Sequence, residues 1–94
     1  MSAAQAGAPL RGPLTFKTAP PALDELAARL ERGGALTVDL QAVDYVDSAG
    51  LALLLELTRR AKSEGATLRL TGASEQLRRL TKFFGIDALL PFAA

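Results

Sequence analysis

The sequence contains no cysteine and no histidine among its 94 residues. Without cysteine, neither a disulfide framework nor a thiolate metal site can form. The joint absence of the two residue types also removes the usual zinc ligands, Ser-His-Asp catalysis and the commonest general base. We therefore expect a protein that is not an enzyme and that uses no metal and no cofactor.

Long apolar runs are also missing. The longest uninterrupted one, Leu51 to Leu55, is far shorter than the roughly 20 residues that a membrane span needs. The segment from Met1 to Pro9 lacks the basic start and the apolar centre of a signal peptide. These absences predict a cytoplasmic protein without a transmembrane segment.

The sequence also lacks an excess of charge of either sign. The 11 Lys and Arg residues nearly balance the 10 Asp and Glu residues, which leaves a net charge of +1. Because the positive residues are scattered, the sequence does not indicate a nucleic-acid-binding surface. Arg78, Arg79 and Lys82 nevertheless form a small basic face, which is usually solvated surface and could complement an acidic partner.

The chain length suits one small domain with a single modest core. Residues 1–9 offer little to bury and are predicted to be a disordered tail, which leaves residues 10–94 as the domain. The alternation of Leu14 to Thr18 predicts a first strand, while Leu10 to Pro13 is at most a fragment of an earlier one.

Three helices and two further strands follow from the apolar spacing. Helices are predicted from Pro21 to Gly33, from about Ala49 to Glu64 with Gly65 as a left-handed stop, and from Ser74 as N-cap to Gly85. Strands are predicted over Leu36 to Gln41 and over Thr67 to Thr71, and an apolar segment of Ile86, Leu89, Leu90 and Phe92 should pack back on the domain.

This alternation of strands and helices predicts an α/β fold with a small, mostly parallel sheet and right-handed crossovers. The one-sided alternation within the strands indicates that the helices pack mainly on one face. In such sheets, ligands and partners meet the loops that follow the carboxyl ends of the strands. The Asp47-Ser48 turn lies on one of these loops.

The segment from Val43 to Leu55 is the most informative, because an acidic turn with one hydroxyl runs directly into an apolar helix start. One arc of this helix can face a core along its whole length, and it consists of Leu53, Leu54, Leu57 and Ala61. Leu51 and Leu55 lie on the neighbouring arc, which becomes polar at Thr58 and Lys62. This half-length stripe fits a docking patch, and it equally fits two leucines that pack beneath a neighbouring element.

Ser48 has three interpretations. As a nucleophile it would lack the histidine that normally activates a serine hydroxyl. As a helix N-cap, its hydroxyl would accept a hydrogen bond from a backbone N–H two or three residues on. As a phosphoacceptor, it would gain a charge of about −1.5 to −2 at a helix N-terminus, where the helix tolerates it.

The Asp47-Ser48-Ala49-Gly50-Leu51 turn within Val43 to Leu55 resembles the signature loop of STAS domains, the family that includes anti-sigma factor antagonists. The resemblance continues through Lys62 to Leu70 and Leu77 to Leu90, and it covers roughly residues 10 to 92. STAS domains usually place two strands before the first helix, whereas this sequence supports only one. An unpaired sheet edge would allow self-association with another chain.

The resemblance implies a non-enzymatic regulatory or assembly subunit that binds the ATPase of an ABC phospholipid transporter, at the periphery of the inner membrane. The alternative is an anti-sigma factor antagonist that binds an anti-sigma factor kinase and is switched by phosphorylation of Ser48. In either case the family's partner-binding surface falls on Asp47, Ser48, Ala49, Gly50, Leu51, Leu54 and Leu55.

Overall fold

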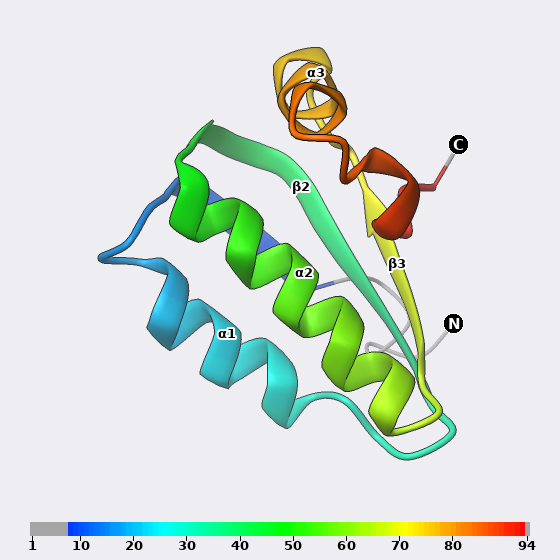
Figure 1. Cartoon of the computed structure of the whole chain (residues 1–94). Coiled ribbons are helices and arrows are strands. Elements are labelled where there is room, and N and C mark those ends of the chain that lie inside the picture. Colours follow the sequence, from blue (N-terminus) through cyan, green and yellow to red (C-terminus); the bar gives the residue numbers. More distant parts are fainter. Residues whose placement is uncertain (1–7, 94) are drawn as a thin grey trace.

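The computed structural model describes residues 8–93, which form a three-stranded sheet with helices between the strands (Figure 1). The elements are β1 (Ala8–Leu14), α1 (Ala19–Ala28), β2 (Ala35–Val46), α2 (Ser48–Ser63), β3 (Thr67–Thr71), α3 (Glu75–Phe83) and a 3-10 helix, η2 (Asp87–Leu89). The strands lie in the order β1-β2-β3, and both neighbouring pairs are parallel. The predicted α/β class with a parallel sheet is therefore confirmed.

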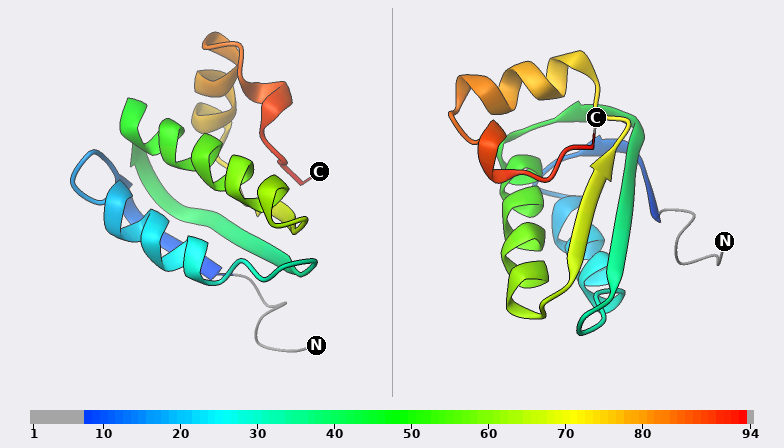
Figure 2. Two further views of the ribbon diagram at one scale, coloured as in Figure 1. Left: turned by 60° about the horizontal axis from the view of Figure 1, so that its bottom comes forward. Right: turned by 90° about the vertical axis from the view of Figure 1, so that its right-hand side faces the viewer.

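The helices cover one face of the sheet. Because consecutive strands are neighbours and the crossovers share one hand, α1 and α2 lie on the same side. Figure 2 shows these two helices along that face, while α3 lies across the end at which the strands finish. The prediction of helices mainly on one face is confirmed, and the loops that follow the strands lie at the same end of the sheet as α3.

The core lies between the sheet and α2. Val38 of β2, Leu70 of β3 and Leu54 and Leu57 of α2 are all fully inaccessible to solvent. Burying a leucine or valine side chain stabilises a fold by about 1.5–3 kcal/mol, so these residues fix α2 against the strands. The opposite face of the sheet is polar, as the exposed Arg69 of β3 illustrates.

A bulge redirects the end of β2. Pro9 of β1 pairs with Asp39, whereas Arg11 pairs with Ala42, so β2 has one residue more than β1 over this stretch. Such bulges bend the strand that contains the extra residue. After the bulge, Val43 returns to the buried side and brings the end of β2 to the start of α2.

The prediction of a strand from Leu14 to Thr18 is wrong. β1 ends at Leu14, and the next four residues form a turn in which the Thr18 hydroxyl donates to the carbonyl oxygen of Pro13 at 2.9 Å. The Thr15 N–H donates in turn to the Thr18 hydroxyl oxygen at 2.8 Å. These side-chain bonds favour a turn over a continued strand.

The domain also begins earlier than predicted. Ala8 and Pro9, assigned above to the tail, belong to β1 and pair with Val38 and Asp39. β1 contains Pro9 and Pro13, which are tolerated there because β1 is an edge of the described sheet. Residues 1–7 of the predicted tail lie outside the described residues.

Later boundaries agree with the sequence pattern for α2, β3 and α3, whereas α1 ends at Ala28, before the predicted Gly33, and β2 continues to Val46, beyond the predicted Gln41. α2 ends next to Gly65, which has a φ of 62°, and β3 covers the predicted residues. The C-terminal segment covers the outer edge of β3, because Leu70 donates to the Pro91 carbonyl at 2.9 Å and accepts from Ala93 N–H at 2.8 Å. Leu90 of this segment is buried, but Leu89 is 62% exposed. Within residues 8–93, no helix has both the length and the hydropathy of a membrane span.

Candidate partner-binding site at the start of helix α2

Asp47 organises the turn between β2 and α2. One carboxylate oxygen, Oδ1, accepts hydrogen bonds from the Ala49 N–H at 2.8 Å and from the Gly50 N–H at 3.1 Å. Asp47 is therefore the N-cap of α2, and the prediction that Ser48 caps the helix is wrong. Because aspartate and serine cap helices about equally well, no local preference distinguishes these two adjacent candidates.

The second carboxylate oxygen of Asp47 reaches another segment. Its Oδ2 accepts a hydrogen bond from the Phe16 N–H at 3.2 Å, and the Asp47 N–H donates to the Leu14 carbonyl at 3.2 Å. The loop between β1 and α1 is thereby fixed to the start of α2. Asp47 positions the surface around Ser48 through these four bonds.

Gly50 brings the helix start against β1. A Cβ atom at this position would lie 2.5 Å from the Leu14 carbonyl oxygen and 2.7 Å from Cγ1 of Val46, and both distances are shorter than real Cβ contacts. Gly50 is itself buried. Its role in the site is close packing, so the prediction that it contacts a partner is not supported by its position.

Ser48 is the exposed residue of the turn. It is the first residue of a 16-residue helix, and no hydrogen bond from its hydroxyl is found within residues 8–93. A phosphate on this hydroxyl would lie at the positive end of the helix dipole, where it stabilises the helix. Ala49, beside it, is half-buried. The hydroxyl is thus accessible both to a partner and to a modifying enzyme.

The predicted leucine patch is largely core. Leu51 is 5% exposed, so its place in an exposed docking patch is wrong, and Leu54, which the resemblance assigns to the partner-binding surface, is fully buried. Leu51 belongs to the same buried cluster as Leu77 of α3, which lies across this end of the molecule (Figure 1). Leu55 is half-buried and remains accessible. The second of the two interpretations of this stripe therefore holds for Leu51.

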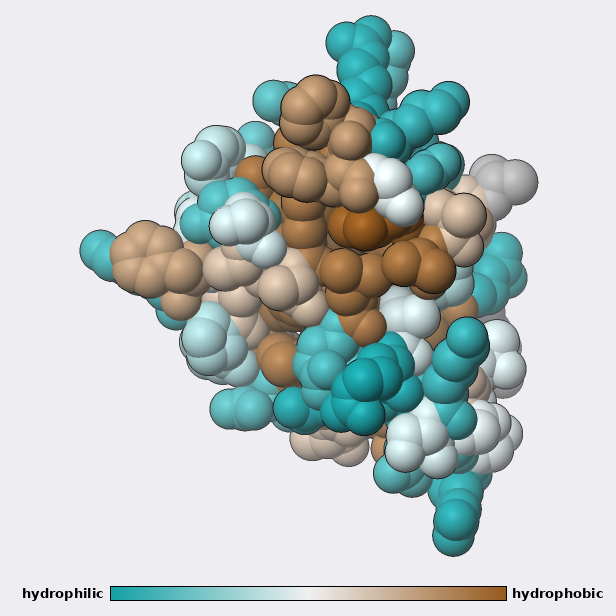
Figure 3. All heavy atoms as spheres, viewed as in Figure 1, coloured by the Kyte–Doolittle hydropathy of each residue, from teal (hydrophilic) through white to brown (hydrophobic). Residues whose placement is uncertain are grey.

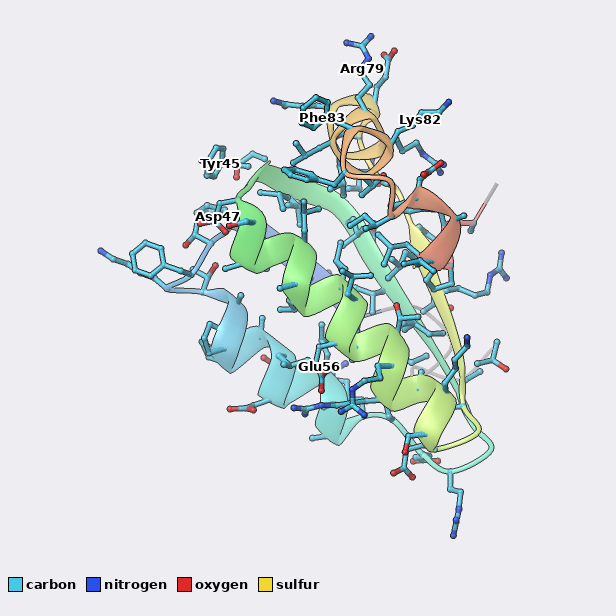
Figure 4. The ribbon with its side chains drawn as sticks, viewed as in Figure 1. Tyr45, Asp47, Glu56, Arg79, Lys82 and Phe83 are labelled. Atoms are coloured by element: carbon cyan, nitrogen blue, oxygen red, sulfur yellow. The ribbon has the colours of Figure 1, made fainter. Side chains whose placement is uncertain are left out.

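The sequence pattern missed the exposed aromatic residues near this turn. Phe16 is 68% exposed, Tyr45 is 58% exposed and Phe83 is 83% exposed. Tyr45 and Phe83 point outward at the same end of the molecule as Asp47 (Figure 4). Exposed apolar surface marks an interaction site where several such groups lie together. The available signal was the position of Tyr45 between the acidic residues of the turn.

The strongest electrostatic feature lies away from this site. The pKa of Glu56 is lowered to about 2 by hydrogen bonds from the side chains of Arg59 and then Arg60. The same contact raises the pKa of Arg59. Figure 4 shows Glu56 well along α2 from Asp47, so this cluster supports the helix and takes no part in the turn. No group of three or more potential metal-ligating side chains occurs in the described part of the chain.

Comparisons with known proteins agree on one family. The family model described as "Mlab, STAS domain" matches residues 2–91. The anti-sigma-B factor antagonist of Bacillus subtilis (strain 168) is 29% identical over 85 residues, which cover 90% of this chain and 78% of that protein. The intermembrane phospholipid transport system binding protein MlaB of Escherichia coli (strain K12) is 38% identical over 55 residues, which cover 58% of this chain and 57% of MlaB.

Solved structures share the fold. A sulfate transporter family protein from Wolinella succinogenes has a TM-score of 0.73 and 24% identity, over 90% of this chain and 72% of that one. The anti-sigma factor antagonist SpoIIAA in its unphosphorylated form has a TM-score of 0.65 and 18% identity, over 80% of this chain and 70% of that one. At these identities the likeness is one of fold.

Proposed function

This chain belongs to the STAS domain family, and we propose that it is a non-enzymatic regulatory or assembly subunit that binds the ATPase of an Mla-type ABC phospholipid transporter. The main support is the exposed start of α2, where Ser48 follows Asp47 and where Phe16, which donates its N–H to Asp47, and Tyr45 are both largely exposed. The site presents an accessible hydroxyl and apolar rings, which suit protein contact. The relatives are named as a binding protein and an antagonist, and both names describe roles in interaction.

The contact surface in this proposal consists of Ser48, Ala49 and Leu55 with the rings of Phe16 and Tyr45. Asp47 holds the turn in place from within, and the buried Gly50, Leu51 and Leu54 support it from below. An interface with aromatic anchors at its centre is typical of lasting complexes. Through such a partner, the chain would lie in the cytoplasm at the periphery of the inner membrane.

A second candidate function is that of an anti-sigma factor antagonist. The observation in its favour is the exposed hydroxyl of Ser48 at a helix N-terminus, together with a match to the Bacillus subtilis antagonist over 90% of this chain. Under this proposal an anti-sigma factor kinase phosphorylates Ser48, and the added charge changes the affinity for that kinase.

Co-expression tests the first proposal. The chain is expressed with the ATPase subunit of the phospholipid ABC transporter from its own host, and complex formation is measured by size-exclusion chromatography. We expect a stable complex with wild type and Ser48→Ala, and a weakened one with Ser48→Asp, because a new charge must then be desolvated in the interface. Thr67→Asp adds the same charge at an exposed site at the far end of the sheet and should leave the complex unchanged.

Intact mass spectrometry decides between the two candidates. For the antagonist, incubation with the host's anti-sigma factor kinase and ATP should add one phosphate to the wild type and none to Ser48→Ala. Stoichiometric phosphate on Ser48 in protein taken from the host, together with no complex with the ATPase, would reject the transporter proposal in favour of the antagonist.

A further inference from the structure

A shallow apolar hollow lies between α2 and the segment around η2. It has a volume of about 320 Å³, and it is lined by Thr58, Ala61, Lys62, Ala66, Leu68, Ala88, Leu89, Leu90 and Pro91. Ala61, Leu68 and Leu90 are buried and form its floor, while Leu89 on its border is 62% exposed. In Figure 3, hydrophobic side chains gather over this part of the molecule, between α2 and the α3–η2 region. We call this surface the α2–η2 groove.

The groove adjoins the arc of α2 on which Leu51 and Leu55 are followed by the polar Thr58 and Lys62. Thr58 and Lys62 lie on one face of α2, and Leu55 precedes Thr58 by three residues on that same face. Leu55 is half-buried, so the accessible part of the stripe runs from the proposed contact surface into the groove. A partner bound at the start of α2 could therefore extend along the helix without a break.

The charges around the groove are mainly positive. Among the described residues, Lys62 is the one ionisable residue that lines it, and the adjacent hollow on the other side of η2 is lined by Arg78, Lys82 and Asp87. Neither Lys62 nor Lys82 forms an ion pair with any residue between 8 and 93. Arg78 is partly engaged, because its guanidinium donates to the Ala93 carbonyl and stacks 5.0 Å from the ring of Phe92.

Two further exposed apolar residues lie at the end of α3, outside the lining of the groove. Phe83 and Phe84 are 83% and 56% exposed, and their rings contact each other edge to face with centroids 5.4 Å apart. α3 is anchored instead by Leu77 and Thr81, which are buried.

We propose that the α2–η2 groove binds an amphipathic helix of the protein partner, with an apolar face on Leu89 and the groove floor and with acidic residues opposite Lys62 and Lys82. A helix in a hydrophobic groove is a recurrent recognition mode, and opposite charges on the rim fix its orientation. The inference rests on the proposed function in one respect, since it assigns the groove to the same partner that binds the start of α2.

Two other occupants fit the groove less well. A second copy of this chain, paired by a two-fold axis, would bring like charges such as Lys62 and its equivalent toward each other. A membrane surface would need apolar groups that project together, whereas much of the apolar surface here forms the floor of a hollow. A protein helix with acidic flanks fits both the hollow shape of the groove and the positive charge around it.

Binding to the purified ATPase subunit provides the first test. We expect Leu89→Glu and Lys62→Glu each to weaken binding about tenfold or more, because each places a negative charge where acidic residues dock. Arg69→Glu makes the same charge reversal on the uncovered face of the sheet and should bind as wild type does. Because Leu89, Lys62 and Arg69 are exposed, all three variants should unfold at the wild-type temperature. If the ATPase binds Leu89→Glu and Lys62→Glu normally while Ser48→Asp weakens the complex, the proposed function stands and the groove proposal is wrong.

A second test does not depend on the ATPase. The ¹⁵N-labelled chain is titrated with two synthetic amphipathic helices that share a leucine face and differ only in glutamate or lysine on the other face. We expect the acidic peptide to shift the amides of Thr58, Lys62 and Leu89 and to bind about tenfold more tightly than the basic one. This result without ATPase binding would retain the groove and reject the proposed function. Equal affinity for the two peptides, or shifts elsewhere, would overturn the groove proposal.

Two controls with the same Leu89→Glu variant test whether a membrane surface or a second copy of the chain binds the groove instead. Sedimentation with phosphatidylglycerol vesicles should leave the wild-type chain in the supernatant, and analytical ultracentrifugation should find it monomeric at the peptide-binding concentration. Vesicle binding or dimerisation that is abolished by Leu89→Glu would assign the groove to a membrane or to a second copy and would refute the proposal.

Discussion

The carboxylate of Asp47 and the backbone N–H of Phe16 form a 3.2 Å hydrogen bond between residues 31 positions apart. The same carboxylate caps α2 through Ala49 and Gly50. One side chain thus sets both the start of the helix and the position of the loop beside it. These two interactions of Asp47 hold the neighbouring Ser48 in a fixed position on the surface.

Asp47→Ala should destabilise the domain and release the loop before α1. Loss of the N-cap costs about 1 kcal/mol, and loss of the bond to Phe16 adds to it, so we expect about 1–2 kcal/mol in all. For a domain of this size, each kcal/mol corresponds to a fall of about 4–8 °C in the melting temperature. Calorimetry measures the loss, and amide hydrogen exchange at Phe16 measures the release of the loop.

Ser74→Ala is the matched control for that variant. Ser74 caps α3 by accepting a 3.0 Å hydrogen bond from the Leu77 N–H, and its side chain joins no second segment in the described structure. Ser74→Ala should lower the free energy of unfolding by about 1 kcal/mol and leave amide exchange at Phe16 unchanged. Equal exchange at Phe16 in both variants would mean that Asp47 does not hold the loop.

Local signals explain why much of the fold follows from the sequence. Thr67 to Thr71 alternates between buried and exposed residues, and Ser74 and Gly85 mark the start and the end of α3. Both elements are therefore found where the pattern predicts them. The signals are local because each depends on residues within a turn or two. β1 lacks such a signal, since Pro9 and Pro13 suit it only as an edge strand beside β2.

The candidate site was less predictable because its features depend on tertiary contacts. Whether Asp47 or Ser48 caps α2 is decided by the loop at Phe16, which is far away in sequence. Whether Leu51 is exposed depends on how α2 packs in the common core, and no periodicity within α2 contains that information. The pattern therefore predicts where the turn lies, whereas the cap at Asp47 and the burial of Leu51 depend on contacts outside α2.

Leu51→Glu and Leu55→Glu should therefore differ sharply. Leu51 is 5% exposed, and a buried unpaired carboxylate at this position should destabilise the fold by several kcal/mol. Leu55 is half-buried on the accessible side of α2, so Leu55→Glu should fold and lose partner affinity instead. Urea denaturation followed by circular dichroism distinguishes the two. A stable, fully folded Leu51→Glu protein would contradict the burial of Leu51.

Gly50→Ala should be destabilising although alanine is the better helix former. Replacing glycine within a helix normally gains about 1 kcal/mol, but here the new Cβ would lie 2.5 Å from the Leu14 carbonyl oxygen. We expect a net loss of about 1–3 kcal/mol as α2 moves away from β1. Ala52→Ser, at an exposed position of the same helix, should change stability by less than about 0.5 kcal/mol. A Gly50→Ala protein more stable than wild type would show that the helix start is not tightly packed.

Ser48→Ala should leave the fold almost unchanged. The cap belongs to Asp47, and the hydroxyl of Ser48 is exposed, so we expect a change within about 0.5 kcal/mol. Thermal unfolding of Ser48→Ala and Asp47→Ala under the same conditions makes the comparison. A loss at Ser48 as large as the loss at Asp47 would return the capping role to the serine.

Glu56 gives the domain one identifiable dependence on pH. Hydrogen bonds from Arg59 and Arg60 lower its folded pKa to about 2 from an ordinary value of 4.5. Because the folded pKa is the lower one, the stabilisation is present above the unfolded pKa and is lost as pH falls from about 4.5 toward 2. The Glu56 side chain is 30% exposed and solvent screens it, so the effect should be modest and should shrink in high salt.

Glu56→Gln should flatten the acid limb of the stability curve. Urea midpoints measured between about pH 5 and pH 2 should fall less steeply for this variant than for the wild type, and the two curves should converge at the acid end because both proteins then lack the charge. Glu25→Gln is the matched control, since Glu25 pairs with Arg29 at 3.4 Å across side chains that are 71% and 51% exposed. This looser pair should alter the slope less, because its two partners remain largely hydrated. Parallel acid limbs for Glu56→Gln and the wild type would show that the bonds from Arg59 and Arg60 do not stabilise α2 in solution.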